Sequence, residues 1–297
     1  RKCYLLSVLL MTVWLTGCVQ EEFESTPSPA GNGIRFTLTV PDVNLPSVSS
    51  RTMTGTGTAK KEDEIETVDI LVFDMSKTPA VFLEWVSATG VTQDLADNST
   101  VSFSAVLSPT TASTCIVVVA NKELDNIVSG FTKGATTKVE AMEKMLHTQT
   151  GKWLADGSTT GGYTRIPMYG EKVISKITPS MDPITGINMK RMLARIDIRN
   201  NSATSNFTVE EVYLANYNTT GYIAPAWNTN GQVTDPVPDT PVLPAGSGKK
   251  TEEGDAILYS VNGNTPYDGE IYTFESLAAE DAGGTGADGE AVRMLLA

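Results

Sequence analysis

The chain has 297 residues, 35 of them acidic and 22 basic, which gives a formal net charge of −13 at pH 7. A negative field of this size repels phosphate backbones and anionic lipid head groups, so it excludes nucleic acid and an electrostatically bound membrane from the expected partners. The single histidine excludes zinc sites built from several histidines. We therefore expect no metal, no cofactor and no catalytic centre.

The first eighteen residues predict where the chain goes. Two basic residues precede an apolar run at 4–15, and small residues then lead to Cys18. This order is typical of a secretory signal, and the run is too short for a membrane span, which needs about 20 apolar residues. The sequence LTGC at 15–18 resembles the lipobox of bacterial lipoproteins, in which a peptidase cuts before a lipidated cysteine. We expect residues 1–18 to be a lipoprotein signal peptide that the lipoprotein export machinery processes, and Cys18 to carry the only membrane anchor, a lipid.

Residues 19–33 are rich in Ser, Pro, Gly and Glu, which predicts a flexible linker. The following segment, 33–40, alternates apolar and polar side chains, and a period of two predicts a half-buried strand. Its apolar face consists of Ile34, Phe36, Leu38 and Val40. A polar stretch that contains Arg51 then predicts an exposed loop.

Strands dominate the prediction from residue 64 to residue 177. We expect them at 64–74, 81–86, 99–107, 115–120, 163–169 and 171–177. Segment 115–120 is apolar without interruption, which predicts a central strand covered on both faces, with Cys115 as a core residue rather than a nucleophile. Two helices are expected at 122–128 and 138–147 as lids over a sandwich edge, the second with a capping box of Thr137 and Glu140.

The second half continues with short strands. Segment 188–199 has a period of two that places Met192, Ala194, Ile196 and Ile198 inward, and further strands are expected at 206–214, 256–261 and 270–274. Many strands with few helices predict an all-β fold with minor helices, arranged as β-sandwiches in tandem. We expect domains at 34–186 and 187–297, the second truncated because the sequence stops within an apolar run.

Candidate catalytic features are few. His147 is expected at the exposed end of the second helix, near the negative end of its dipole. Segment 245–251 (AGSGKKT) lacks the spacing of a phosphate-binding loop. The acid pairs Asp63 with Glu64 and Asp268 with Glu270 could form a glycosidase couple, although solvated carboxylates are the commoner explanation. The tryptophans could stack on sugars or pack in the core. Three of the four tryptophans are considered for these roles: Trp85, Trp153 and Trp227. We expect no enzyme.

Several short segments, in order along the chain, resemble those of the fimbrillin, or type V pilin, family of Bacteroidetes. They are LTGC at 15–18, the strand and loop around Arg51, VDILVF at 68–73, IVVVAN at 116–121, IPMYG at 166–170, RMLARID at 191–197 and YTFE at 272–275. The resemblance implies two tandem transthyretin-like β-sandwich domains. It also implies exposure at the cell outer membrane and assembly with other subunits, as a homopolymer, into a fimbria.

The resemblance further implies trimming by an arginine-specific protease and polymerisation by exchange of a strand between subunits. On this basis we expect cleavage after Arg51, and we expect the strand with Ile34, Phe36, Leu38 and Val40 to be the one that is exchanged. The family's donor strand would lie beyond Ala297, so stalk, tip and anchor roles all stay open. The alternative is a monomeric surface lipoprotein that binds glycan or host protein.

Overall fold

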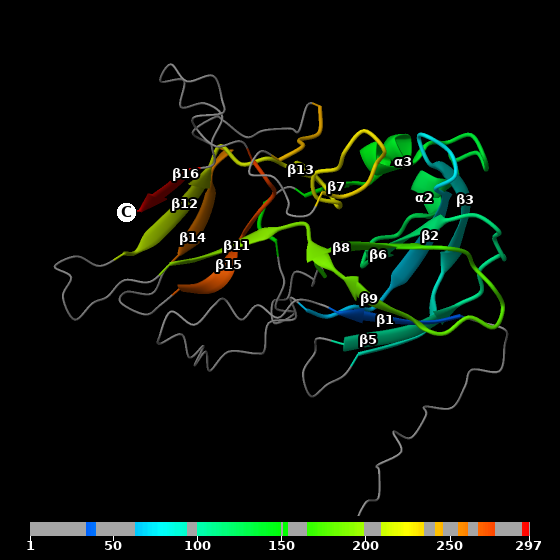
Figure 1. The fold of residues 1–297 in the computed structure, drawn as a ribbon. Coiled ribbons are helices and arrows are strands. Elements are labelled where there is room, and N and C mark those ends of the chain that lie inside the picture. Colours follow the sequence, from blue (N-terminus) through cyan, green and yellow to red (C-terminus); the bar gives the residue numbers. More distant parts are fainter. Residues whose placement is uncertain are drawn as a thin grey trace, which may run out of the picture. The chain divides into compact units, whose positions relative to one another are not determined.

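The computed structural model describes residues 34–39, 63–93, 100–149, 151–153, 165–198, 209–234, 241–245, 255–260, 267–276 and 293–296 (Figure 1). Strands dominate it, with two short helices, which confirms the predicted all-β class with minor helices. In chain order the elements are β1 (Ile34–Thr39), β2 (Val68–Asp74), β3 (Val81–Ser87), β4 (Thr89–Gln93), β5 (Thr100–Ala105), β6 (Thr114–Ala120), α2 (Asp125–Val128), α3 (Lys138–Lys144), β7 (Leu146–Thr148), β8 (Met168–Ile174), β9 (Ile184–Asn188), β10 (Lys190–Arg191), β11 (Ala194–Ile198), β12 (Glu211–Ala215), β13 (Thr220–Tyr222), β14 (Ile257–Ser260), β15 (Tyr267–Thr273) and β16 (Arg293–Leu296).

Two sheets contain most strands of the first 191 residues. The first sheet has the order β4-β5-β1-β9 and the second the order β10-β8-β6-β2-β3. One apolar cluster joins them: alternate side chains of β1 and β5 meet alternate side chains of β2 and β6. The alternation in β1 therefore has the physical basis that the sequence indicates, because one face of that strand is in the core and the other is not.

The second sheet is covered on its other face as well. All seven residues of β6 are buried; Ile116 and Val118 face the first sheet, whereas Cys115, Val117 and Val119 belong to a separate cluster. This confirms the prediction that segment 115–120 is central. Burial raises the pKa of the Cys115 thiol to about 11, so this cysteine is an inert core residue.

The two helices cover this second face rather than a sandwich edge, which corrects the expectation. Val128 of α2 and Ala141 and Met142 of α3 pack in the same cluster as the odd-numbered side chains of β6. The physical reason is that a strand apolar on both faces needs cover on both. The predicted capping box is confirmed: Glu140 N donates to Thr137 Oγ1 (3.2 Å), and Thr137 N donates to Glu140 Oε2 (2.8 Å).

His147 is not at an exposed helix end, so that prediction was wrong. Helix α3 ends at Lys144, and His147 lies in β7, opposite Gly221 of β13. The centroid of its ring lies 5.0 Å from that of Trp153 and 6.4 Å from that of Phe274. Neither ring nitrogen of His147 has a hydrogen-bond partner among the described residues. Burial, together with the nearby Lys122 charge, lowers the pKa of His147 to about 4, so the ring is neutral near pH 7.

Segment 188–199 does not form one strand. β10 pairs with β8 of the second sheet, and β11 pairs with β15. Met192 is buried and Ile196 and Ile198 are partly buried as predicted, but Ala194 is exposed. The change of partner between the two strands breaks the alternation that the sequence pattern assumes.

The remaining strands form a three-stranded sheet of order β14-β12-β16 around a third apolar cluster, which includes Val212, Leu214 and Tyr259. The division into domains 34–186 and 187–297 stays a prediction.

Candidate functional site

The predicted exchange strand, β1, lies in the middle of the first sheet. It runs antiparallel to β5, with Phe36 opposite Phe103 and Leu38 opposite Val101, and parallel to β9. Ile34, Phe36 and Leu38 are 5%, 1% and 0% exposed. The structure therefore brings three of the four predicted exchange residues together in one core. Val40, Arg51 and Cys18 lie outside the described residues.

The core face of β1 is centred on a pair of aromatic rings. Phe36 stacks on Phe103 with ring centroids 5.0 Å apart and an interplanar angle of 6°. Each large apolar side chain that is fully buried contributes about 1.5–3 kcal/mol relative to exposure, and an aromatic pair adds about 0.5–1.5 kcal/mol. Removal of β1 would leave a space between β5 and β9 that opens onto the apolar cluster joining the two sheets. We call this space the β1 slot.

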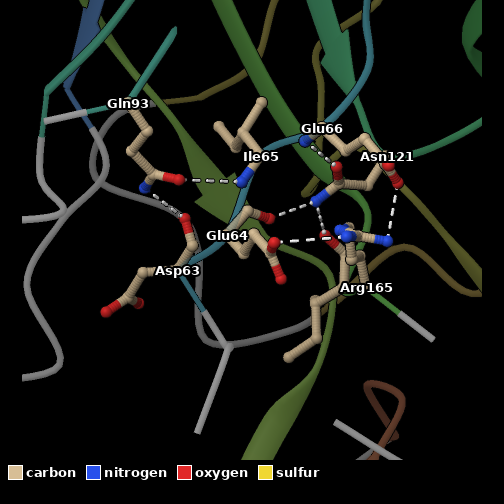
Figure 2. A network of polar contacts seen from close by, with 8 residues as sticks. Asp63, Glu64, Ile65, Glu66, Gln93, Asn121 and Arg165 are labelled. Carbon is tan, nitrogen blue, oxygen red and sulfur yellow. Dashed lines mark hydrogen bonds and ion pairs between the residues drawn. The ribbon is translucent and has the colours of Figure 1, made fainter. Parts of the chain in front are cut away.

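The chain that follows the predicted cleavage loop is fastened by side-chain amides (Figure 2). Asn121 Nδ2 donates to Glu64 O (2.8 Å) and Ile166 O (3.0 Å), and Asn121 Oδ1 accepts from Glu66 N (3.0 Å). Gln93 Nε2 donates to Asp63 O (2.7 Å), and Gln93 Oε1 accepts from Ile65 N (3.1 Å). These bonds satisfy the backbone of residues 63–66 before β2 begins.

Ion pairs reinforce the same segment. The Arg165 guanidinium lies 3.2 Å from Glu64 Oε1 and 2.6 Å from Glu66 Oε2, and Arg191 pairs with Asp63. We call residues 63–66 with Gln93, Asn121, Arg165 and Arg191 the clasp. Asp63 and Glu64, considered above as a glycosidase couple or as solvated carboxylates, are in fact paired with arginines. The carboxylates of the clasp therefore hold a chain segment in place.

Sequence reasoning missed the clasp, although one signal was present. Asn121 follows directly after the apolar strand β6 and has a positive φ of 57°. Asparagine is one of the few residues that enter this left-handed region readily, and its short side chain then bonds to nearby backbone. An Asn at the end of a buried strand therefore indicates a turn, but not which distant segment it binds.

A buried ion pair links α3 to β8. Lys138 is fully buried, and its Nζ lies 2.5 Å from Glu171 Oε2. The Tyr169 hydroxyl donates to the same carboxylate oxygen (2.7 Å), and Val233 N donates to Glu171 Oε1 (3.1 Å). The buried Lys138 charge is thus compensated by the partly buried Glu171, so this pair joins three parts of the chain rather than forming a reactive centre.

Trp85, Trp153 and Trp227 make packing contacts or hydrogen bonds with other described residues. Trp153 is buried in the second apolar cluster, and Trp85 Nε1 donates to Asp69 (3.1 Å). Trp227 packs edge-on against Tyr222, with ring centroids 4.8 Å apart. The part of the chain that the structure describes contains no group of three or more His, Cys, Asp and Glu side chains placed to hold a metal. No helix within that part is long and apolar enough to cross a membrane.

Comparison with solved structures found low-identity similarities. A fimbrial assembly protein from Parabacteroides distasonis is 10% identical with a TM-score of 0.46, over 89% of this chain and 82% of that one. A candidate cell adhesion protein from the same organism is 16% identical with a TM-score of 0.45, over 84% and 73%. A candidate adhesin from Bacteroides ovatus is 12% identical with a TM-score of 0.39, over 89% and 71%. No curated protein sequence matched the chain.

The family comparison is decisive. The sequence model of the major fimbrial subunit protein (FimA) family matches residues 34–191, which is more than half of the 297-residue chain. The matched range begins with β1 and ends with β10, so it contains every strand of the two sheets that enclose the β1 slot. The chain belongs to the major fimbrial subunit protein (FimA) family.

Proposed function

We propose that the protein is a structural subunit of a cell-surface fimbria that is exported as a lipoprotein and assembled by protease-triggered exchange of a strand between subunits. Family membership supports a structural role in a fimbrium, in contact with other subunits. The observation that carries the finer proposal is the position of β1, the first described strand, in the middle of its sheet between β5 and β9.

The covalent link through residues 40–62 would keep β1 in its slot. While the link is intact, β1 competes for the slot at the high effective concentration of a tethered segment, so the precursor stays closed. After a cut behind Arg51, only non-covalent contacts would hold β1 to the rest of the protein. Departure of β1 would then expose apolar surface and two unpaired strand edges, a state that favours addition of a strand from another subunit.

Because of the clasp, a cut after Arg51 would release β1 but not the segment that leads into β2. Residues 63–66 are bonded to Gln93, Asn121 and Arg165, and these partners all lie downstream of Arg51. Residues 63–66 would therefore stay fastened ahead of β2, while the strand upstream of the cut is free to leave. We infer that the clasp protects the second sheet from unravelling when the first sheet loses a strand.

The test is to expose purified full-length wild type and full-length Arg51→Ala, each including the family's donor strand, to an arginine-specific protease. Wild type is expected to lose an N-terminal fragment that ends at Arg51 and then to form a ladder of oligomers, because only the cut chain can release β1. Mass spectrometry identifies the fragment, and gels run without boiling show the ladder. Lys60→Ala is the matched control and should behave as wild type. Equal assembly by Arg51→Ala, or a wild-type cut at another position, would exclude Arg51 as the switch.

Lipidation at Cys18 is the second part of the proposal, and it is supported by the LTGC sequence at 15–18. Cys18→Ala should accumulate as an unprocessed or mislocalised precursor, because the thiol that carries the lipid is gone. Metabolic labelling with a fatty acid and fractionation of membranes measure this, with Cys115→Ala as the cysteine control. Normal membrane-attached mature protein from Cys18→Ala would contradict the proposal.

A further inference from the structure

Strand β9 forms one wall of the β1 slot, and it needs support from outside its own sheet if it is to stay in place without β1. Among the described strands, its only ladder partner is β1, and that ladder is irregular between Phe36 and Leu38. Loss of β1 would thus remove all the strand pairing that holds β9. A wall without other support would be free to move across the gap and bury the exposed apolar surface.

We propose that Gly170 and Lys172, both on β8, are positioning residues that hold β9 in place when β1 leaves and so keep the slot open for an incoming strand. This inference rests on the proposed function. It adds a mechanism by which the second sheet maintains the acceptor site of the first.

Gly170 permits an unusually close approach of β9 and the residue after it to β8. A Cβ atom at Gly170 would lie 2.8 Å from Ile187 Cγ2, 2.8 Å from Met189 Sδ and 3.0 Å from Asn188 O. Real Cβ atoms essentially never come closer than 3.0 Å to such neighbours, so any side chain at this position would force Ile187 or Met189 to shift. The end of β9 therefore rests directly on the backbone of β8.

Lys172 fastens the start of β9. Its Nζ donates a hydrogen bond to Thr185 O, the carbonyl of the second residue of the strand. Gly170 and Lys172 thus hold the two ends of β9, and neither contact involves an atom of β1. The core side chains Ile184 and Ile187 add apolar packing between the same ends.

Both walls of the slot therefore have a partner other than β1. β8 pairs with β6 along all seven of its residues, from Met168 opposite Ala120 to Ile174 opposite Thr114, so it is a firm support for β9. The opposite wall, β5, pairs with β4. An acceptor whose two edges are already in position loses less conformational freedom when a strand binds, and this favours affinity and rate.

The experiment measures how well the trimmed protein, freed of its β1 fragment, rebinds a synthetic peptide of residues 33–40. Lys172→Met keeps the aliphatic stem but cannot donate to Thr185 O. We expect peptide affinity to fall about tenfold to a hundredfold, since a hydrogen bond from a charged donor is lost at the wall. Uncut Lys172→Met should unfold at most a few degrees below wild type, because only one exposed hydrogen bond is lost and β1 still pairs with β9.

Matched variants separate this effect from a general loss of stability. Lys176→Met removes an exposed lysine just beyond β8 and should rebind the peptide as wild type does. Gly170→Ala should weaken rebinding as well, and its uncut thermal unfolding shows whether it folds. Equal peptide affinity of trimmed wild type and Lys172→Met would overturn the inference. If trimmed wild type rebinds the peptide more tightly than Lys172→Met but never forms oligomers, the proposed function fails and the inference holds.

Discussion

Phe36→Ala is expected to lower the free energy of unfolding of the uncut precursor by about 3–5 kcal/mol and to let it assemble without protease. The ring is 1% exposed and stacks on Phe103, so its removal leaves a cavity in the cluster between the two sheets. The contacts that hold β1 in its slot are then too weak to keep the precursor closed. Chemical denaturation measures the first effect, and unboiled gels of untreated protein measure the second.

Trimming supplies an internal control for this prediction. Residue 36 lies upstream of Arg51, so wild type and Phe36→Ala yield trimmed products of identical sequence if the cut is at Arg51. Their stabilities and rates of assembly should then coincide. Arg35→Ala changes an exposed neighbour on the same strand and should behave as wild type before and after trimming. A Phe36→Ala precursor that is destabilised but stays monomeric until it is cut would show that β1 is not the gate.

The sequence predicted the parts of the fold that have local patterns. The alternation of Ile34, Phe36 and Leu38 gave β1, and the unbroken apolar run at 115–120 gave a strand buried on both faces. By contrast, β9 (ITGIN) carries only two apolar side chains and a glycine with φ of 71°, so it has no strand period. Its pairing with β1 joins parts of the chain that are far apart in sequence, and no local pattern records such long-range pairing.

The site was less predictable than the fold because its contacts join distant residues. Glu66 and Asn121 are 55 residues apart, and Arg165 and Glu64 are 101 residues apart. The prediction for His147 failed for a similar reason. Helical spacing continues to residue 147, but Met145 adopts φ of −81° and ψ of 73°, and the chain after it pairs with β13. Tertiary pairing thus overrides the local helical preference.

Asn121→Ala should lower the free energy of unfolding by about 2.5–6.5 kcal/mol and loosen residues 63–66. Three hydrogen bonds are lost, each contributing about 0.5–1.5 kcal/mol, and alanine in the left-handed region costs about 1–2 kcal/mol more. Asn121→Gly loses the same bonds without the backbone strain, so it should be less destabilised than Asn121→Ala. Hydrogen exchange of the Glu66 amide, which donates to Asn121 Oδ1, reports the clasp directly.

The Ile65 amide is the reference within the same segment, because it donates to Gln93 rather than to Asn121. In Asn121→Gly its exchange should accelerate less than that of Glu66. The comparison is most informative in protein already trimmed at Arg51, where β1 no longer precedes residues 63–66 and they are held by the clasp together with the packing of Ile65 in the apolar cluster between the two sheets. If the Glu66 amide stays protected in trimmed Asn121→Gly as it does in trimmed wild type, the arginine ion pairs are enough to hold residues 63–66. Asn121 is then not the residue that anchors this segment.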